Sequence, residues 1–78
     1  MKMNNARRKK LAGIVSSLES AQELLEELRD EEQDYLDNMP ESLQSSDKYS
    51  IGEEAIENME SAIDSINEVI DYVESAKS

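Results

Sequence analysis

Apolar residues recur at alternating intervals of three and four residues in two separate stretches of this chain. Such a repeat places one apolar residue on the same side of a helix at every turn, as the a and d positions of a heptad do. Each stretch therefore predicts a long amphipathic helix that needs a cover for its apolar side. The repeat residues are Leu11, Ile14, Leu18, Ala21, Leu25, Leu28 and Tyr35 in the first stretch, where only Glu32 interrupts, and Ile56, Met59, Ile63, Ile66, Ile70 and Val73 in the second.

The ends of the helices are indicated by capping and breaking residues. The first helix is expected to begin somewhere in 4–10. Pro40 disfavours helix at the residue before it, so this helix is expected to end near residue 38. Ser50 and Glu53 fit a capping box for the second helix, while Ser46 followed by Asp47 offers a start one turn earlier. The predicted organisation is a single domain, 1–78, with a basic arm at 1–10, a helix at 11–38, a connection at 39–49 and a helix at 50–77.

Two helices of similar length with one connection predict an all-α fold, an antiparallel, coiled-coil-like hairpin. Pairing the two repeats along their length sets Leu28 near Ile56 and Leu18 near Ile66. Each apolar stripe is wider than one partner helix covers, so a homodimer that forms a four-helix bundle is expected. A docking surface for another protein and a monomer with an apolar edge are the alternatives. The expected hairpin or dimer core comprises Leu18, Leu25, Leu28, Ile56, Met59, Ile63, Ile66 and Ile70.

The charge of the chain is strongly negative and unevenly distributed. The 78 residues carry a net charge of −11, and every acidic residue follows the basic arm, which holds Lys2, Arg7, Arg8, Lys9 and Lys10. Such a surface repels nucleic acid and anionic membranes and attracts basic partners. Direct nucleic-acid binding through the arm is disfavoured for this reason.

An acidic run in the first helix is the predicted partner-binding face. Its density of about one carboxylate per 3 Å of helix axis approaches the one phosphate per ~3.4 Å of a DNA strand. The run predicts a protein partner with a basic surface and allows DNA-mimic-like electrostatics. Alternatively, these carboxylates serve only solubility. The face comprises Glu23, Glu26, Glu27, Asp30, Glu31, Asp34 and Asp37.

The composition argues against catalysis and against a bound metal or cofactor. The chain has no histidine and no cysteine, which removes the commonest general base, nucleophile and zinc ligands. Glu32 at a core position resembles an inward carboxylate of a di-iron bundle, but such sites also need Glu-x-x-His. No apolar run approaches the ~20 residues that span a bilayer. We therefore expect a cytoplasmic protein that is not an enzyme.

The connection between the helices carries apolar residues that need an explanation. One interpretation, the preferred one, is that they fold back with Tyr35 and cap the open end of the bundle. The other is that they contact a partner, as loops on rigid scaffolds often do. These residues are Met39, Pro40, Leu43 and Tyr49.

Three stretches resemble a group of small acidic helical proteins encoded by phages and prophages of bacteria. They are NARRKKL at 4–11, LRDEEQDYLDNMPESLQSS at 28–46 and AIENMESAIDSINEVIDYV at 55–73. The resemblance covers nearly the whole chain, and its most specific part is Pro-Glu-Ser-Leu-Gln at 40–44. It implies a phage-borne protein that acts in the cytoplasm of a bacterial host, and it implies no activity or site residues. Small acidic phage proteins are often inhibitors of host or defence machinery, and this is an analogy of class.

The leading hypothesis is a non-enzymatic interaction protein that binds, and by analogy inhibits, a bacterial host or anti-phage defence protein through its acidic faces. The alternative hypothesis is a helical spacer or assembly factor that acts through its apolar stripe. The two differ in which surface a loss of function would follow, the carboxylates or the apolar residues.

Overall fold

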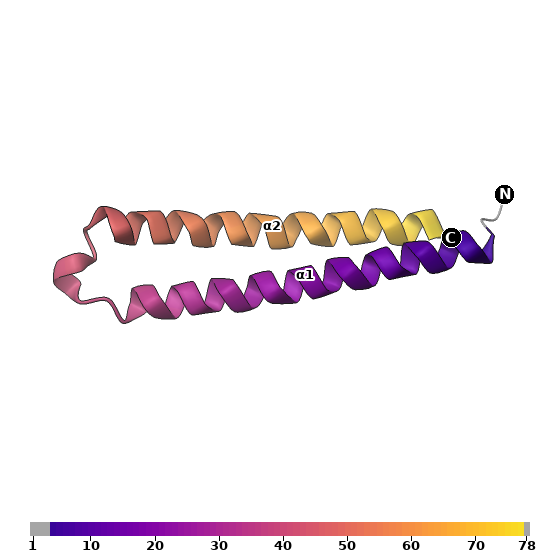
Figure 1. Ribbon diagram of the computed structural model, residues 1–78. Helices are drawn as coiled ribbons and strands as arrows, with labels where there is room; N and C mark the ends of the chain where they lie inside the picture. Colours follow the sequence, from indigo (N-terminus) through magenta and orange to yellow (C-terminus); the bar gives the residue numbers. More distant parts are fainter. Residues whose placement is uncertain (1–3, 78) are drawn as a thin grey trace.

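Two long helices lie side by side in antiparallel orientation and form a narrow rod (Figure 1). The computed structural model describes residues 4–77, so Lys2 of the basic arm lies outside the described residues. Helix α1 spans Asn5–Asp37, a short 3₁₀ helix η1 spans Glu41–Leu43, and helix α2 spans Asp47–Lys77. The Cα trace extends over 62 × 15 × 12 Å. The predicted all-α hairpin is confirmed, with the connection at one end of the rod and both chain ends at the other.

Helix α1 begins at Asn5, within the expected range of 4–10 and before the boundary drawn at residue 11, because Asn4 caps it. The Asn4 side-chain oxygen accepts a hydrogen bond from the Arg7 backbone N–H at 2.9 Å, which satisfies one of the free amides of the first turn. The described basic residues therefore belong to the helix rather than to an extended arm. At the other end, the side-chain amide of Asn38 donates to the Asp34 carbonyl at 2.8 Å.

The basic start of α1 lies beside the C-terminal end of α2, as expected from the helix dipole. Arg8 Nε donates a hydrogen bond to the Lys77 carbonyl oxygen at 3.1 Å. The last carbonyls of a helix have no partner within the helix and carry partial negative charge. Arg8 therefore joins the two chain ends.

Replacing Arg8 by alanine is expected to fray the last turn of α2, since the Lys77 carbonyl loses its cationic donor. Lys9→Ala is the matched control, because Lys9 is an exposed basic residue next to Arg8 on the same helix. Amide hydrogen exchange of the final turn should be several-fold faster in Arg8→Ala than in Lys9→Ala. Equal exchange rates in the two variants would show that the hydrogen bond from Arg8 to Lys77 does not stabilise the last turn of α2.

Helix α2 begins at Asp47, so the boundary at residue 50 is three residues late. The Ser46 hydroxyl accepts a hydrogen bond from the Tyr49 N–H at 3.4 Å, and the Ser50 N–H donates to the Ser46 carbonyl at 3.2 Å. Ser46 is thus the capping residue, and the earlier of the two predicted starts is correct. The helix runs through Gly52 although glycine weakens a helix by about 1 kcal/mol.

The two helices meet along one seam of heptad positions a and d. On α2 this seam is the predicted repeat, extended at both ends. On α1 it is rotated by one residue from the predicted repeat, so that Ile14, Ala21, Leu28 and Tyr35 are exposed beside the seam. The seam of α1 consists of Arg8, Val15, Gln22, Arg29 and Leu36 at position a and Leu11, Leu18, Leu25 and Glu32 at position d; that of α2 consists of Tyr49, Ile56, Ile63, Ile70 and Lys77 at a and Gly52, Met59, Ile66 and Val73 at d.

The rotation of α1 has a physical reason in its polar seam residues. Gln22 Nε2 donates to the Ile63 carbonyl at 3.0 Å and to Asn67 Oδ1 at 2.8 Å. A half-buried amide with hydrogen-bond partners costs little, so Gln22 is tolerated in the seam. In return Val15 and Leu36 become buried, and Leu36 is only 1% exposed. Leu28, expected in the core, lies outside the hairpin seam and is 45% exposed.

Leu36 packs directly onto the backbone of Gly52 near the connection. A Cβ atom added at Gly52 would lie 2.7 Å from Leu36 Cδ2 and 3.3 Å from Glu32 Oε1, whereas one added at Gly13 would meet nothing within 4 Å. The close approach of α1 to α2 at this end therefore requires a residue without a side chain.

The two glycines should respond oppositely to alanine. Gly13→Ala should raise the free energy of unfolding by about 1 kcal/mol through helix propensity. Gly52→Ala gains the same propensity but overpacks the buried Leu36, which costs typically 1–3 kcal/mol, so a net loss is expected. Urea unfolding followed by circular dichroism measures both. A gain of stability in both variants would contradict the close packing of Leu36 on Gly52.

Candidate protein-interaction surface

One long side of the hairpin is formed by heptad positions g and c of both helices, and we call it the apolar face. In an antiparallel pair the same letters of the two helices flank the seam on the same side. The contact between Tyr35 and Lys48, both at position g, confirms this, since Lys48 Nζ lies 5.4 Å from the Tyr35 ring centroid. The face comprises Arg7, Lys10, Ile14, Ser17, Ala21, Leu24, Leu28, Glu31 and Tyr35 of α1 and Lys48, Ile51, Ala55, Asn58, Ala62, Ser65, Val69, Tyr72 and Ala76 of α2.

The exposed large hydrophobic side chains of both helices gather on the apolar face. Leu28 and Leu24 lie about one turn apart on α1, and Tyr72 on α2 is 76% exposed. Grouped exposed apolar side chains of this kind are uncommon on a soluble monomer and are typical of interaction sites. The large apolar members are Ile14, Leu24, Leu28, Tyr35, Ile51, Val69 and Tyr72.

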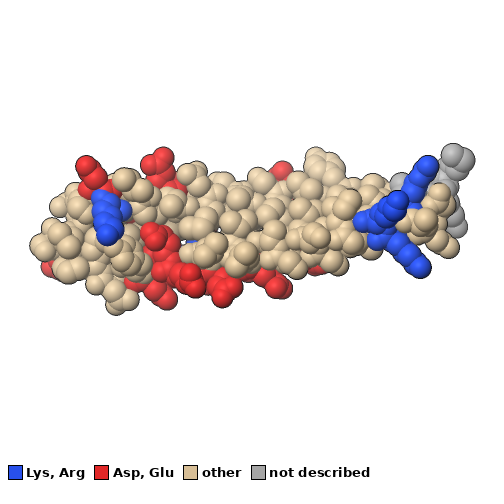
Figure 2. Space-filling view, viewed as in Figure 1, with Lys and Arg blue, Asp and Glu red and all other residues tan. Residues whose placement is uncertain are grey.

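Negative charge is nearly absent from the apolar face. All acidic residues of α1 and α2 except Glu31 and Glu32 occupy positions b, e or f. Glu32 lies in the seam, which leaves Glu31 as the one carboxylate that the described residues place on the apolar face. Figure 2 shows a broad surface without charged side chains along the middle of the rod, with red atoms mainly along its lower edge and toward the connection, and blue atoms at both ends. The hairpin therefore has one apolar side and one acidic side.

The predicted acidic face of α1 does not form a single surface. Its members are all exposed. However, they spread around the outer half of the helix, because they occupy four different heptad positions. Glu31 lies on the apolar face, while the others lie on the opposite side or at the back: Glu23, Asp30 and Asp37 at position b, Glu26 at e, and Glu27 and Asp34 at f.

On α2 the acidic residues are more regularly placed and extend the acidic side of the rod. Six of them lie at positions e and b, the other three lie at position f, and none is among the residues predicted as partner-binding. Together with Glu19, Glu23, Glu26 and Asp30 of α1 they form a carboxylate surface along both helices, which we call the acidic side. Its α2 members are Glu53, Glu57, Glu60, Asp64, Asp71 and Glu74.

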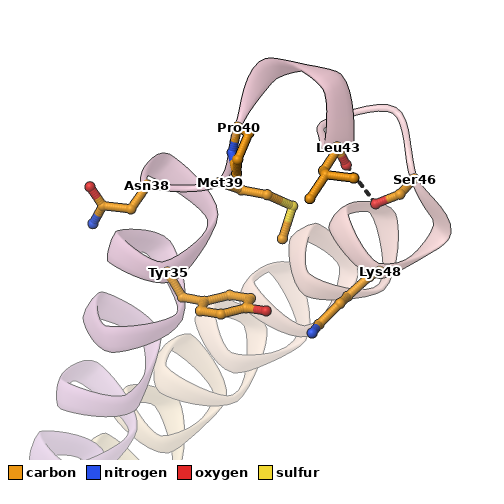
Figure 3. Close-up of a pocket in the computed structure, with 7 residues that line it drawn as sticks. All are labelled: Tyr35, Asn38, Met39, Pro40, Leu43, Ser46 and Lys48. Atoms are coloured by element: carbon orange, nitrogen blue, oxygen red, sulfur yellow. Dashed lines mark hydrogen bonds between the residues drawn. The ribbon is translucent and has the colours of Figure 1, made fainter.

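A hollow of about 550 Å³ opens at the connection end of the apolar face. In Figure 3 the side chains of Met39, Pro40 and Leu43 lie together above the ring of Tyr35, and Lys48 approaches that ring from α2. Leu43 remains half exposed. The hollow is lined by Tyr35, Asn38, Met39, Pro40, Leu43, Ser46 and Lys48.

The expected cap of the bundle end is wrong in one respect. Tyr49 does not join Tyr35, because it lies at position a and lines a separate groove with Gln33, Ile56 and neighbouring glutamates. The end of the hairpin is sealed instead by Leu36 against Gly52. Met39, Pro40 and Leu43 therefore cover the end only partly and leave an open apolar hollow.

Lys48 places a positive charge at the rim of this hollow. Its hydrogen-bonding and charge interactions with Tyr35 raise the pKa of Lys48, Glu32 adds to the rise, and desolvation opposes it. Lys48 therefore stays cationic over the face of an aromatic ring, a favourable cation–π arrangement.

Within residues 4–77 no cluster of acidic, histidine or cysteine side chains is arranged to hold a metal ion. No helix in this described part of the chain has the length and apolar character to cross a membrane. Comparisons with protein-family models, curated proteins and solved structures found no match.

The sequence analysis predicted an apolar stripe wider than one helix covers, but it did not assign the residues of the apolar face as a unit. Ile51 did not stand out because it falls outside the heptad repeat. The signal was present, since only one acidic residue occupies a c or g position in either helix. It becomes visible once the seam of α1 is assigned to positions 8, 15, 22, 29 and 36.

Proposed function

We propose that this protein is a non-enzymatic interaction module. Two copies associate through their apolar faces into a four-helix bundle, and the acidic sides of the dimer bind a protein partner with a basic surface. The observation that carries the proposal is the separation of the helical side chains into an apolar face and an acidic side.

The size of the apolar face supports a second copy as its cover. A face about 45 Å long on a rod 15 Å across amounts to roughly 700 Å² per copy, close to the ~800 Å² per partner of a standard stable interface. A hairpin of this size buries little on its own. Association through these faces adds a second apolar layer and leaves the carboxylates in water.

The charge of the dimer supports a basic partner. Each copy carries a net charge of −11, and a face-to-face dimer keeps the two acidic sides on its outside. Such a surface speeds the approach of basic proteins and repels nucleic acid. The resemblance to small acidic phage proteins suggests which partner this is: a nucleic-acid-handling host or anti-phage defence protein in the bacterial cytoplasm, inhibited by occupation of its basic groove.

Affinity capture from nuclease-treated bacterial lysate tests the partner. A four-site variant, Glu53→Lys, Glu57→Lys, Glu60→Lys and Asp64→Lys, should lose the captured protein. A matched variant with the same number of charge changes at the back of the rod, Glu27→Lys, Asp34→Lys, Glu54→Lys and Glu68→Lys, should retain more of it. Capture should weaken in ~0.5 M salt, where exposed charges are screened beyond a few Å. Capture that is equal in both variants and in salt would contradict the electrostatic mechanism.

A second candidate function is a structural spacer or assembly factor that uses the apolar face to bind a different protein. The open hollow beside Met39 and Leu43 favours it, since a partner side chain could enter there. Leu43→Asp should then abolish partner capture, while the lysine variants of the acidic side should leave it intact.

A further inference from the structure

We propose that the second copy lies antiparallel on the apolar face, with its connection at the opposite end of the bundle. The two-fold axis passes through the layer of Ala21 and Ala62, and Lys10 of each copy pairs with Glu31 of the other. This inference rests on the proposed dimer and specifies its orientation and register.

The first step is the order of layers along one hairpin. Tyr35 lies opposite Lys48. One heptad earlier in α1 faces one heptad later in α2, so the next g layer pairs Leu28 with Ala55. The layers that follow pair Ala21 with Ala62 and Ile14 with Val69.

Two further contacts show that the two helices stay paired in antiparallel order along the rod. Gln22 reaches the Ile63 carbonyl in the middle, and Arg8 reaches the Lys77 carbonyl at the far end. Each step toward the N-terminus of α1 is therefore matched by a similar step toward the C-terminus of α2 over the full length of the seam. The layer with the two smallest side chains, Ala21 and Ala62, falls at the centre of the helical rod.

The second step is the symmetry of the apolar face about that central layer. A two-fold axis across the rod at Ala21 sets Ala21 against its own copy, and Ile14 against Leu28 of the second copy. Small side chains at the centre let the helices approach, and larger ones on either side fill the space, which is how interdigitating layers pack. The face is therefore complementary in size to itself when one copy is reversed.

The third step is charge. The same axis places Lys10 opposite Glu31 of the second copy. Lys10 is a cation near one end of the apolar face, and Glu31 is the carboxylate near its other end. Lys48 does not add to this pairing, because it already lies over the Tyr35 ring of its own copy. The Lys10–Glu31 pair, which forms twice per dimer, favours the antiparallel arrangement.

A partner of another kind fits the face less well. A basic protein would find one carboxylate there and three cations, Arg7, Lys10 and Lys48. An acidic protein would match those cations but lacks the reversed order of large and small residues that a second copy supplies. The apolar face is therefore assigned to self-association and the acidic side to the basic partner.

Cysteine cross-linking tests the arrangement, and the chain has no cysteine of its own. Ala21→Cys should form a disulfide-linked dimer under mild oxidation at least 10-fold faster than Ser20→Cys, whose side chain lies at position f on the back of α1. If the connections lie at the same end, Ala21→Cys should link to Ala62→Cys in a mixture and not to itself. That result would overturn the orientation while leaving the dimer in place.

Sedimentation equilibrium of the unmodified protein distinguishes a failure of the proposed dimer from a failure of its proposed orientation and register. A monomeric mass at every concentration removes the dimer of the proposed function, and the register with it. A dimeric mass without preferential Ala21→Cys linkage removes only the register.

A charge swap tests the same register without cross-linking. Lys10→Glu and Glu31→Lys should each weaken the dimer by about 10-fold, because the pair occurs twice per dimer, and the double variant should restore most of the loss. The control pair is Lys9→Glu and Glu23→Lys, at position b away from the face, which should show no restoration. Losses that simply add in the Lys10 and Glu31 double variant would overturn the pairing.

Discussion

Replacing Ile63 by aspartate is expected to unfold the protein at 37 °C. Ile63 is 7% exposed in the centre of the seam, where its carbonyl also receives the Gln22 amide. A carboxylate there loses the packing of the isoleucine and is buried without a cation, which costs roughly 4 kcal/mol or more. A small domain has about 5 kcal/mol of total stability at the lower end of the usual range, so little would remain. Circular dichroism at 222 nm should show the loss of helix.

Ser61→Asp is the matched control for this prediction. It adds the same charge to the same helix two residues earlier, at an exposed position f. The control should keep its helical signal and its melting temperature within a few degrees. If Ile63→Asp melted like the control, the seam described for α2 would not be the core of the hairpin.

The second large effect is expected at Leu28, and it concerns association rather than the hairpin. Leu28 is 45% exposed in the single chain, yet the proposed dimer buries it against Ile14 of the second copy. Leu28→Asp removes about 2 kcal/mol of apolar burial and adds an unpaired carboxylate, at two places in each dimer. The dissociation constant should therefore rise by about 1,000-fold or more. Sedimentation equilibrium over a concentration series measures it.

Ser20→Asp serves as the control for Leu28→Asp, because it adds the same charge at the back of α1. The dimer should tolerate it. Circular dichroism of Leu28→Asp at each concentration shows whether the separated hairpin stays helical, and Leu28→Ala offers a milder variant that should weaken the dimer by about 10-fold to 100-fold. An unchanged dissociation constant in both Leu28 variants would place the contact elsewhere.

The seam of helix α2 was predictable because one pair of heptad positions holds its largest apolar side chains. From Ile56 to Val73 each a and d position is apolar, and the acidic residues lie at positions b, e and f. A rotation toward positions b and e would bury carboxylates, and a rotation toward position g would replace Ile56, Ile63 and Ile70 by the smaller Ala55, Ala62 and Val69. The structure confirms the predicted seam and extends it to Tyr49 and Lys77.

Helix α1 was predictable as a helix but not in its rotation. Its apolar residues occupy three columns, and choosing any two of them gives a plausible seam. The column of Ile14 and Leu28 is uniformly apolar, whereas the column of Val15 and Leu36 contains Gln22. Periodicity favours the first column. The structure uses the second, because Gln22 finds hydrogen-bond partners on α2 that appear only once both helices are placed.

The boundaries missed by the sequence analysis depend on single side chains. Asn4 and Ser46 each accept a hydrogen bond from a first-turn amide. Several Asn and Ser residues near both helix starts could do so, and the sequence does not distinguish among them. The acidic run could not be assigned to surfaces for a related reason. Which of its residues lie on a common surface can be decided only after the seam of α1 has been located.

The central claim is that the apolar face is covered by a second copy, and the mass of the protein in solution tests it most directly. Sedimentation equilibrium of the unmodified chain in ~0.15 M salt, at micromolar concentrations, should give twice the 8.8 kDa of one chain. The dimer should dissociate when Leu28 is replaced by aspartate. A mass of 8.8 kDa at all concentrations would contradict the account, because the apolar face would then stand exposed in the free protein.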